Sequence, residues 1–171
     1  MKTNLKRSIL KLALASAFVL AGAVITADSY AATTSSNATA TVVTPIAISN
    51  TQQLNFGSFS TTAVGQTVTI SAAGARSATG AIPVPSSAVT AASFNVTGSG
   101  VLTYAITLPA STTITNGTDT FTVNAFTSNP SGTGALTAGA QTLTVGATVT
   151  TAGTLSTGVY NGSFNVSVDY N

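Results

Sequence analysis

The sequence predicts an all-β protein built as an antiparallel sandwich. After residue 31, apolar and polar residues alternate in short runs, which is the period of a strand with one dry and one wet face. Glycine, proline and asparagine separate these runs at short spacing. No run in this part of the sequence has the period of a helix. We therefore expect seven or eight short strands in an immunoglobulin-like arrangement with Greek-key connections.

The expected strands follow one another through the middle of the chain. Their apolar positions are Ile46, Ile48, Leu54 and Phe56; Val68 and Ile70; Phe94 and Val96; Leu102, Tyr104, Ile106 and Leu108; Phe121, Val123 and Ala125; and Leu143, Val145, Ala147 and Val149. The residues that end strands are Gly57, Gly74, Pro109 and Gly153. Residues 74–87, with several glycines and two prolines, are expected to be an irregular connection, and residues 129–134 a loop.

One connection is expected to be a β-hairpin. Asn116-Gly117 lies between two threonine-rich runs. Both central residues of the favoured hairpin turn have positive φ, a conformation that asparagine and glycine tolerate best. The dipeptide therefore predicts a tight reversal of the chain between two paired strands.

The last fourteen residues, from Gly158 to Asn171, predict one long amphipathic strand. One parity holds the apolar row and a glycine: Tyr160, Gly162, Phe164, Val166, Val168 and Tyr170. The other parity is polar and includes Asp169. On the wet face of a last strand, a carboxylate discourages sheet-to-sheet aggregation.

The first 31 residues have the pattern of a secretory signal peptide. Basic residues precede an apolar run at residues 12–25, and Ser29-Tyr30-Ala31 places small residues where a signal peptidase cuts. The apolar run is shorter than the roughly 20 residues of a membrane-spanning helix, and no later segment is longer. We therefore expect cleavage after Ala31, export through the periplasm and no membrane insertion of the mature chain.

The mature chain, residues 32–171, is almost uncharged. Its only charged side chains are Arg76, Asp119 and Asp169. Without a basic surface, nucleic acid and anionic membranes are poor partners. A free soluble domain normally keeps a well-charged surface, so this composition suits a protein whose neighbours are copies of itself.

The composition also argues against an enzyme and against a bound cofactor or metal. Histidine, cysteine and glutamate are absent from the whole chain, and lysine from its mature part. General acid–base and nucleophilic catalysis draw mainly on these residues or on paired carboxylates, whereas the two mature aspartates are fifty residues apart. Asp119, beside Asn116 and Gly117, is better explained as a turn residue than as a calcium ligand, because calcium needs more oxygen ligands and more negative charge.

The end of the chain resembles the C-terminal strand of pilus subunits that are assembled by the chaperone-usher route. The shared features are a glycine fourteenth from the end, Gly158, an alternating apolar row and a penultimate tyrosine, Tyr170. In that family the periplasmic chaperone grips the final strand. The resemblance implies this role for Gly158, Tyr160, Phe164, Val166, Val168 and Tyr170. It also implies a periplasmic pilus chaperone and an outer-membrane usher as partners.

A second resemblance covers nearly the whole mature chain. It lies in the segments 44–46, 55–59, 92–98, 103–109 and 162–166. These segments are similar to those of an uncharacterised family of secreted, Ala/Thr-rich bacterial proteins, suspected to be fimbrial because pilus-type chaperones and ushers are encoded nearby. The family supplies no catalytic or binding residues. Unlike better-studied pilins, this chain lacks a cysteine pair, so its assembly mechanism is an inference.

Residues 32–44 are the candidate donor strand, ahead of a sandwich domain at residues 45–171. In donor-strand exchange, each subunit lacks one strand and receives the N-terminal extension of its neighbour. Here Ala38, Ala40 and Val42 alternate with polar or branched residues, without charge, glycine or aromatic residue. Pro45 keeps the preceding Thr44 extended and removes a backbone donor, as a boundary between two strand roles requires. A mobile mature N-terminus is the alternative.

The sequence therefore predicts a structural subunit of an extracellular, cell-surface fimbria. Two alternatives remain: a secreted adhesin or matrix protein that does not polymerise, and, less favoured, a small outer-membrane β-barrel, whose strands should be longer and flanked by aromatic residues. Three questions stay open: whether residues 32–44 complete their own domain or a neighbour's, whether the subunit is major or minor, and what surface it contacts. Arg76 either pairs with a carboxylate of the next subunit or faces water.

Overall fold

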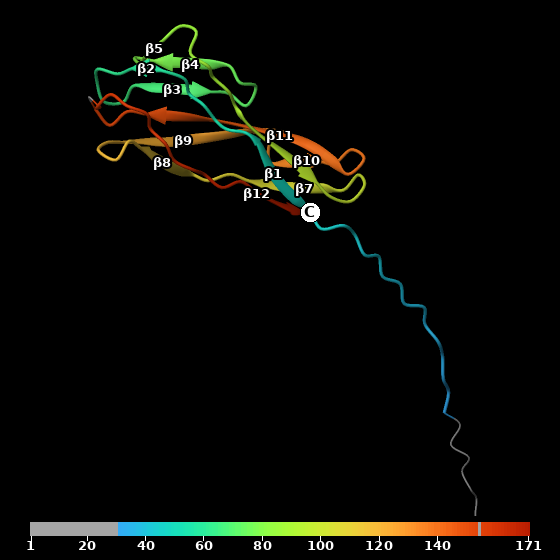
Figure 1. Ribbon diagram of the computed structural model, residues 1–171. Coiled ribbons are helices and arrows are strands. Elements are labelled where there is room, and N and C mark those ends of the chain that lie inside the picture. The colour runs from blue at the N-terminus through green and yellow to red at the C-terminus, as the bar shows by residue number, and fades with distance from the viewer. Residues whose placement is uncertain (1–30, 154) are drawn as a thin grey trace, which may run out of the picture. The chain divides into compact units, whose positions relative to one another are not determined.

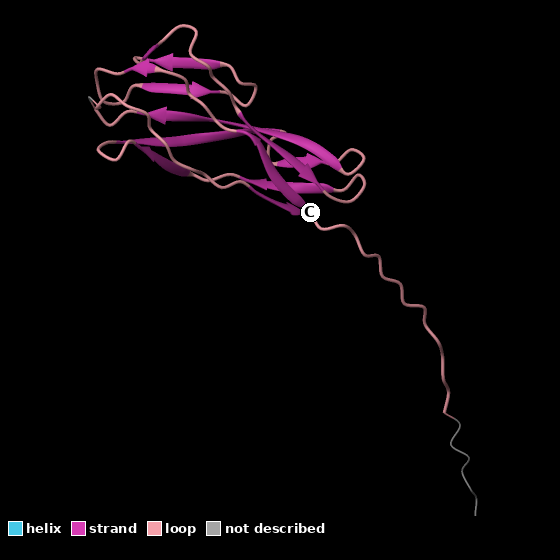
Figure 2. Cartoon of the chain, viewed as in Figure 1, coloured by secondary structure: helices cyan, strands magenta, loops and turns pink. Residues whose placement is uncertain are grey.

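The computed structural model describes residues 31–153 and 155–171 (Figure 1). The chain consists of two units, with the boundary between Thr39 and Ala40. The unit from Ala40 to Asn171 contains every strand of the described chain. All of these strands pair antiparallel, and the described residues form no helix (Figure 2). The predicted all-β, antiparallel sandwich is confirmed. The predicted signal peptide lies outside the described residues, except for Ala31. None of the described segments forms a helix able to span a membrane.

The structure has twelve strands in its described part, more than the sequence predicts. They are β1 (Ala47–Gln52), β2 (Phe59–Ser60), β3 (Thr67–Ile70), β4 (Arg76–Thr79), β5 (Ile82–Pro83), β6 (Ala92–Thr97), β7 (Thr103–Thr107), β8 (Ser111–Thr115), β9 (Thr120–Asn129), β10 (Thr133–Ala135), β11 (Ala140–Thr150) and β12 (Ser167–Tyr170). Most coincide with the alternating runs, because a period of two puts one row of apolar side chains on the core face.

Strand β11 organises the largest sheet. Its first half pairs with β6 and its second half with β3, while β9 lies along its other edge. The sheet continues to β1 and β4 on one side and to β8 on the other. Gly146 is required at the crossover, because a Cβ there would collide with the backbone at Ile70 and Ala72.

A smaller sheet, β10-β7-β12, faces part of the large one, and β2 and β5 form a separate two-stranded ribbon. The buried side chains form two clusters. One gathers around Val68, Ile70, Phe121 and Val149, and the other around Val96, Tyr104, Leu143 and Val145. Burial raises the pKa of Tyr104, whose hydroxyl donates to Gln141 Oε1 at 2.7 Å. The buried phenol therefore keeps a hydrogen-bond partner.

The outward face of β8, β9, β11, β3 and β4 carries short uncharged polar side chains in register. One cross-strand row is Thr113, Thr122, Thr150, Thr67 and Thr79. The next is Ser111, Asn124, Thr148, Thr69 and Ser77. The hydroxyls of Thr69 and Thr148 lie 2.8 Å apart and share a hydrogen bond. Threonine therefore supplies both the strand propensity and the wet surface of this sheet.

The prediction of an irregular connection over residues 74–87 is wrong in part. Strands β4 and β5 lie within it and pair with β3 and β2. Both are edge strands of their sheets. Pro83 is compatible with such a position, since an edge strand can leave one backbone donor out of the ladder.

Two turn predictions also need correction. The hairpin at Asn116-Gly117 exists, but its loop spans residues 116–119 and only Gly117 has positive φ. The Asn116 side-chain oxygen accepts from the amides of Thr118 and Asp119, so the asparagine forms an Asx turn.

The predicted alternation of β9 breaks at Ala125, which has φ of 48° and is exposed, so that Phe126 lies on the core side instead. The predicted loop at residues 129–134 overlaps β9 and β10 at its two ends.

Candidate functional site

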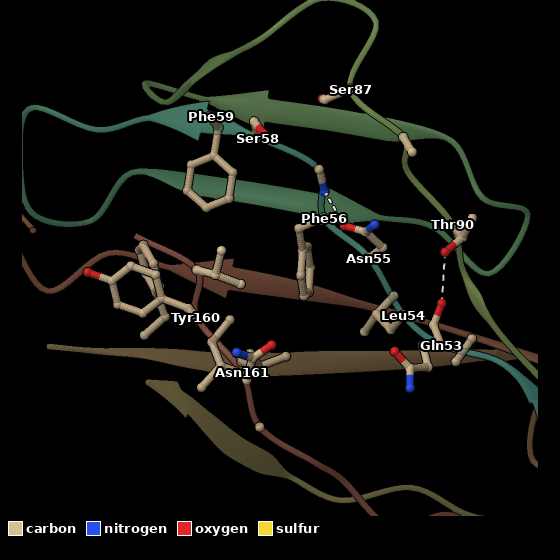
Figure 3. A pocket seen from close by; sticks show the side chains of 18 of the residues that line it. Gln53, Leu54, Asn55, Phe56, Ser58, Phe59, Ser87, Thr90, Tyr160 and Asn161 are labelled. Carbon is tan, nitrogen blue, oxygen red and sulfur yellow. Dashed lines mark hydrogen bonds between the residues drawn. The ribbon is translucent and has the colours of Figure 1, made fainter. Parts of the chain in front are cut away.

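An open groove of about 1280 Å³ runs between two stretches of chain that are remote in sequence (Figure 3). We call residues 50–61 the first lip and residues 155–164 the second lip. Most of the remaining residues that line the groove come from β8, β9, β6 and the segment 87–90. The floor is apolar and includes Ile114, Phe121 and Val123. The groove is therefore a gap in the sandwich with a hydrophobic base.

The first lip leaves the sheet where β1 ends. After Gln52 it is held by a two-bond bridge between Asn55 and Thr90. The Asn55 side chain also accepts from the Gly57 amide at 2.8 Å. Gly57 has φ of 72°, and a Cβ there would meet Arg76 and Ser87. Local turn chemistry thus directs this lip away from β6 and toward β5.

Arg76 binds the backbone of the first lip. Its Nη1 donates to Ser87 Oγ at 2.8 Å and to the carbonyls of Phe56 and Ser58 at 3.4 Å. Its Nη2 donates to the carbonyl of Val84 at 3.0 Å. The sequence predicted that Arg76 either pairs with a carboxylate of the next subunit or faces water. In the structure its guanidinium instead joins two parts of its own domain, the first lip and the segment 84–87.

The second lip lies beside β8 but pairs with it at a single point. Thr115 and Asn161 exchange two backbone hydrogen bonds of 2.9 Å, and Thr112 donates to the carbonyl of Ser163 at 2.8 Å. Gly162 is needed next to this bridge, because a Cβ would collide with the Thr113 carbonyl. In the part of the chain the structure describes, residues 162–166 make no backbone–backbone hydrogen bond.

The prediction of one strand from Gly158 to Asn171 is wrong over its first part. Only β12 is a strand, and it pairs with β7. Residues 162–166 lie opposite the gap between β7 and β8, which contains Pro109. They therefore have no strand to pair with on that side. On the other side lies the groove. The alternation of burial nevertheless holds: Val168 is buried and Tyr160, Phe164, Val166 and Tyr170 are half-buried, while their polar neighbours are exposed.

Asp119 ties the second lip to the β8–β9 loop. Its carboxylate accepts from the Ser156 amide at 2.7 Å, a bond that lowers the pKa of Asp119. The Ser156 carbonyl accepts from the Tyr160 hydroxyl at 2.8 Å. Burial, and then the nearby charge of Asp119, raise the pKa of Tyr160. Asp119 is therefore a structural anchor, and the described residues contain no group of acidic side chains able to hold a metal ion.

Aromatic rings form the floor and walls of the groove. Phe121 contacts Phe59 of the first lip with centroids 5.6 Å apart and Tyr160 of the second lip at 4.5 Å. Phe164 contacts Phe94 at 6.4 Å and Phe126 at 5.0 Å. Figure 3 shows Phe56 and Phe59 facing Tyr160 across the groove. The arrangement can bind an extended apolar chain.

The predicted donor residues lie outside the strands. Ala38 belongs to the first unit, while Ala40 and Val42 begin the second; none of the three is in regular secondary structure. Val42 is 96% exposed, so nothing within its unit covers it. Their role as a donor strand stays a prediction.

Tyr170 fixes the point where the chain enters the domain. Its hydroxyl donates to the Thr44 carbonyl at 2.8 Å and accepts from the Ser99 amide at 2.7 Å. Gly98 must be glycine, since a Cβ would collide with this hydroxyl. The structure thus gives the penultimate tyrosine a contact that sequence reasoning missed.

The chain matches, over residues 46–170, the family described as Domain of unknown function (DUF4402). The chain belongs to this family. The matched range of the DUF4402 domain contains both lips and β12, while the segment 32–44 lies outside it. No curated protein and no solved structure matches the chain. The resemblance to pilus subunits therefore remains a hypothesis.

Proposed function

We propose that the DUF4402 domain is the structural subunit of an extracellular fimbria, secreted with a periplasmic chaperone and an outer-membrane usher and polymerised by donor-strand exchange. The observation that carries the proposal is the groove between the two lips. A sandwich that lacked one strand would have this form: an apolar floor between two edges, one of which, residues 162–166, makes no backbone–backbone hydrogen bond in the described chain. The proposed occupant is the segment 32–44 of a second copy of the chain.

The length of the segment suits the groove. An extended strand rises about 3.3 Å per residue, so residues 32–44 can reach about 40 Å, whereas the part of the first lip beyond β1, residues 53–61, can span at most about 30 Å. The segment can therefore fill the groove and still connect to the domain of its own subunit. Its last residue, Thr44, is fixed beside β12 by the Tyr170 hydroxyl.

The chemistry of the segment suits the groove as well. The segment has no charged residue, and charged side chains do not line the groove. Alanine and threonine are small enough to let a strand approach both lips closely. Burying Val42 contributes about 1.5–3 kcal/mol, and each backbone bond to a lip about 0.5–1.5 kcal/mol. The ladder therefore supplies much of the binding energy.

The substitution Val42→Asp tests the proposal. An aspartate in the apolar groove would be buried without a partner, so we expect polymerisation to fail. Signal-cleaved, folded chain should still reach the periplasm, because Val42 is exposed in its own unit. The measurement is the yield of filaments sheared from cells that express the chain with its chaperone and usher. Val43→Asp is the matched control, since Val43 occupies the opposite parity and is 42% exposed.

Two results would contradict the proposal. Filaments at wild-type yield from the Val42→Asp chain would remove this segment from the mechanism. A wild-type chain that is secreted as a monomer, with no filament under any condition, would favour the non-polymerising adhesin instead.

A further inference from the structure

The two lips have one feature in common: the backbone of each is hydrogen-bonded to a charged side chain. Arg76 binds the carbonyls of Phe56 and Ser58 on the first lip, and Asp119 binds the amide of Ser156 on the second. Neither Arg76 nor Asp119 lines the groove. Both residues therefore contact the lip backbone without being part of the groove lining.

This placement uses two of the three charges of the mature chain. The third, Asp169, lies exposed on β12, outside the groove. Hydrogen bonds to a charged group are shorter and about twice as strong as those between neutral groups. The Asp119 bond to the second lip is of this kind, at 2.7 Å. Arg76 holds the first lip by two longer contacts of 3.4 Å and is itself anchored by bonds of 2.8 Å to Ser87 and 3.0 Å to Val84.

An empty apolar groove has a tendency to close. Moving the lips together would remove the half-buried side chains of Leu54, Phe59 and Tyr160 further from water, which is favourable. A closed groove cannot accept a strand, and the observed capture rate falls in proportion to the open fraction. A site held open in advance avoids this loss and the cost of ordering during binding.

We infer that Arg76 and Asp119 are positioning residues that hold the lips apart until a donor strand enters. The inference rests on the proposed function and adds to it a reason why the unoccupied groove remains competent. Once the donor strand is seated, its own ladder holds the lips. The two residues should therefore affect the capture of a strand far more than its retention.

Capture can be measured on the full signal-cleaved chain with a labelled synthetic peptide of residues 32–44. Asp119→Asn replaces the charge-assisted bond to the Ser156 amide by a weaker neutral one. If this leaves the groove open about a tenth of the time, the association rate should fall about tenfold. The dissociation rate should change little, because the ladder of the seated peptide is intact. Asp169→Asn, which removes the same charge elsewhere, should bind like the wild type.

Arg76 is tested in the same assay by two substitutions. Arg76→Met removes all of its hydrogen bonds and should slow capture at least as much as Asp119→Asn. Arg76→Lys keeps the charge but not the forked geometry, and should give an intermediate rate. If Arg76→Met fails to fold, the association rate of Arg76→Lys alone decides the role of Arg76.

A second measurement does not depend on the peptide. The chain has no cysteine, so spin labels can be attached cleanly to the pair Ser60→Cys and Val159→Cys, one on each lip. The distance between labels should be narrowly distributed in the wild type, and broader and shorter with Asp119→Asn. An unchanged distribution together with wild-type capture would overturn the inference. If the wild-type chain captures no peptide, the proposed function fails, and the distances alone decide the role of the two charges.

Discussion

At the scale of single residues, the side chains that matter most are the ones that join segments far apart in sequence. Tyr170 joins the start of the domain to the β6–β7 turn through one hydroxyl, and Asn55 and Arg76 together shape the first lip. The sequence singled out Tyr170 as the penultimate tyrosine and Arg76 as one of three charged residues, but it did not predict which groups they contact. A contact of this kind depends on tertiary structure, which alternation alone does not contain.

The substitution Tyr170→Phe should destabilise the domain by about 1–3 kcal/mol, because it leaves the Ser99 amide and the Thr44 carbonyl without their partner. Chemical denaturation of the signal-cleaved chain measures this change. Hydrogen exchange should rise at Ser99 in particular. Tyr160→Phe is the control, since that hydroxyl serves the Ser156 carbonyl instead. Equal effects at both sites, with no local rise at Ser99, would contradict the assignment.

Asp119 should titrate below its ordinary pKa of 3.8, because the Ser156 amide stabilises its charged form. Since the pKa is lower in the folded state, the tie contributes to stability above the unfolded pKa and is lost as the pH falls through the folded one. The Ser156 amide resonance, followed by NMR from neutral pH downwards, should shift with the Asp119 carboxylate. Tyr160 stays neutral throughout this range. The shift should vanish in Asp119→Asn, and a midpoint at or above 3.8 would contradict the contact.

At the scale of elements, alternation predicted most of the long strands, because each has one face on a core. It failed where a strand depends on a partner rather than on its own pattern. Strands β4 and β5 lie in a glycine- and proline-rich stretch and form because β3 and β2 lie next to them. Residues 158–166 have the ideal pattern yet are not a strand, because β7 and β8 separate there and the groove borders the other side.

Strand β11 is the element whose packing is most sensitive to a small change. Gly146→Ala should destabilise the domain by about 1–3 kcal/mol, since its methyl group would meet the backbone of Ile70 and Ala72 where β3 joins β11. The midpoint of urea denaturation measures the loss. Thr144→Ala, on the same strand but without such a collision, should cost less. A Gly146→Ala chain as stable as the wild type would contradict the close approach of these strands.

At the scale of the whole molecule, the sequence predicted the fold class, while the groove appeared only in the structure. The two lips are residues 50–61 and 155–164, far apart along the chain, and the alternation of apolar and polar residues does not mark either as the edge of a groove. Two kinds of signal were nevertheless present: Gly57 and Gly162 both allow close approach of neighbouring atoms, and Phe59 and Phe164 are aromatic residues with polar residues on either side in the sequence. Their spatial relation follows from the sheet order, which sequence patterns do not determine.

The central claim is that residues 32–44 of one chain complete the groove of another. Because the chain has no cysteine, Val42→Cys can be paired in turn with a cysteine at Leu54, Ile114 or Tyr160, and the products separated under non-reducing conditions after oxidation. The account predicts that at least one pair gives a ladder of covalent oligomers, and that two single variants mixed together give a dimer. A cross-link confined to monomers would show that each domain completes itself, and no cross-link from any pair would show that this segment does not enter the groove.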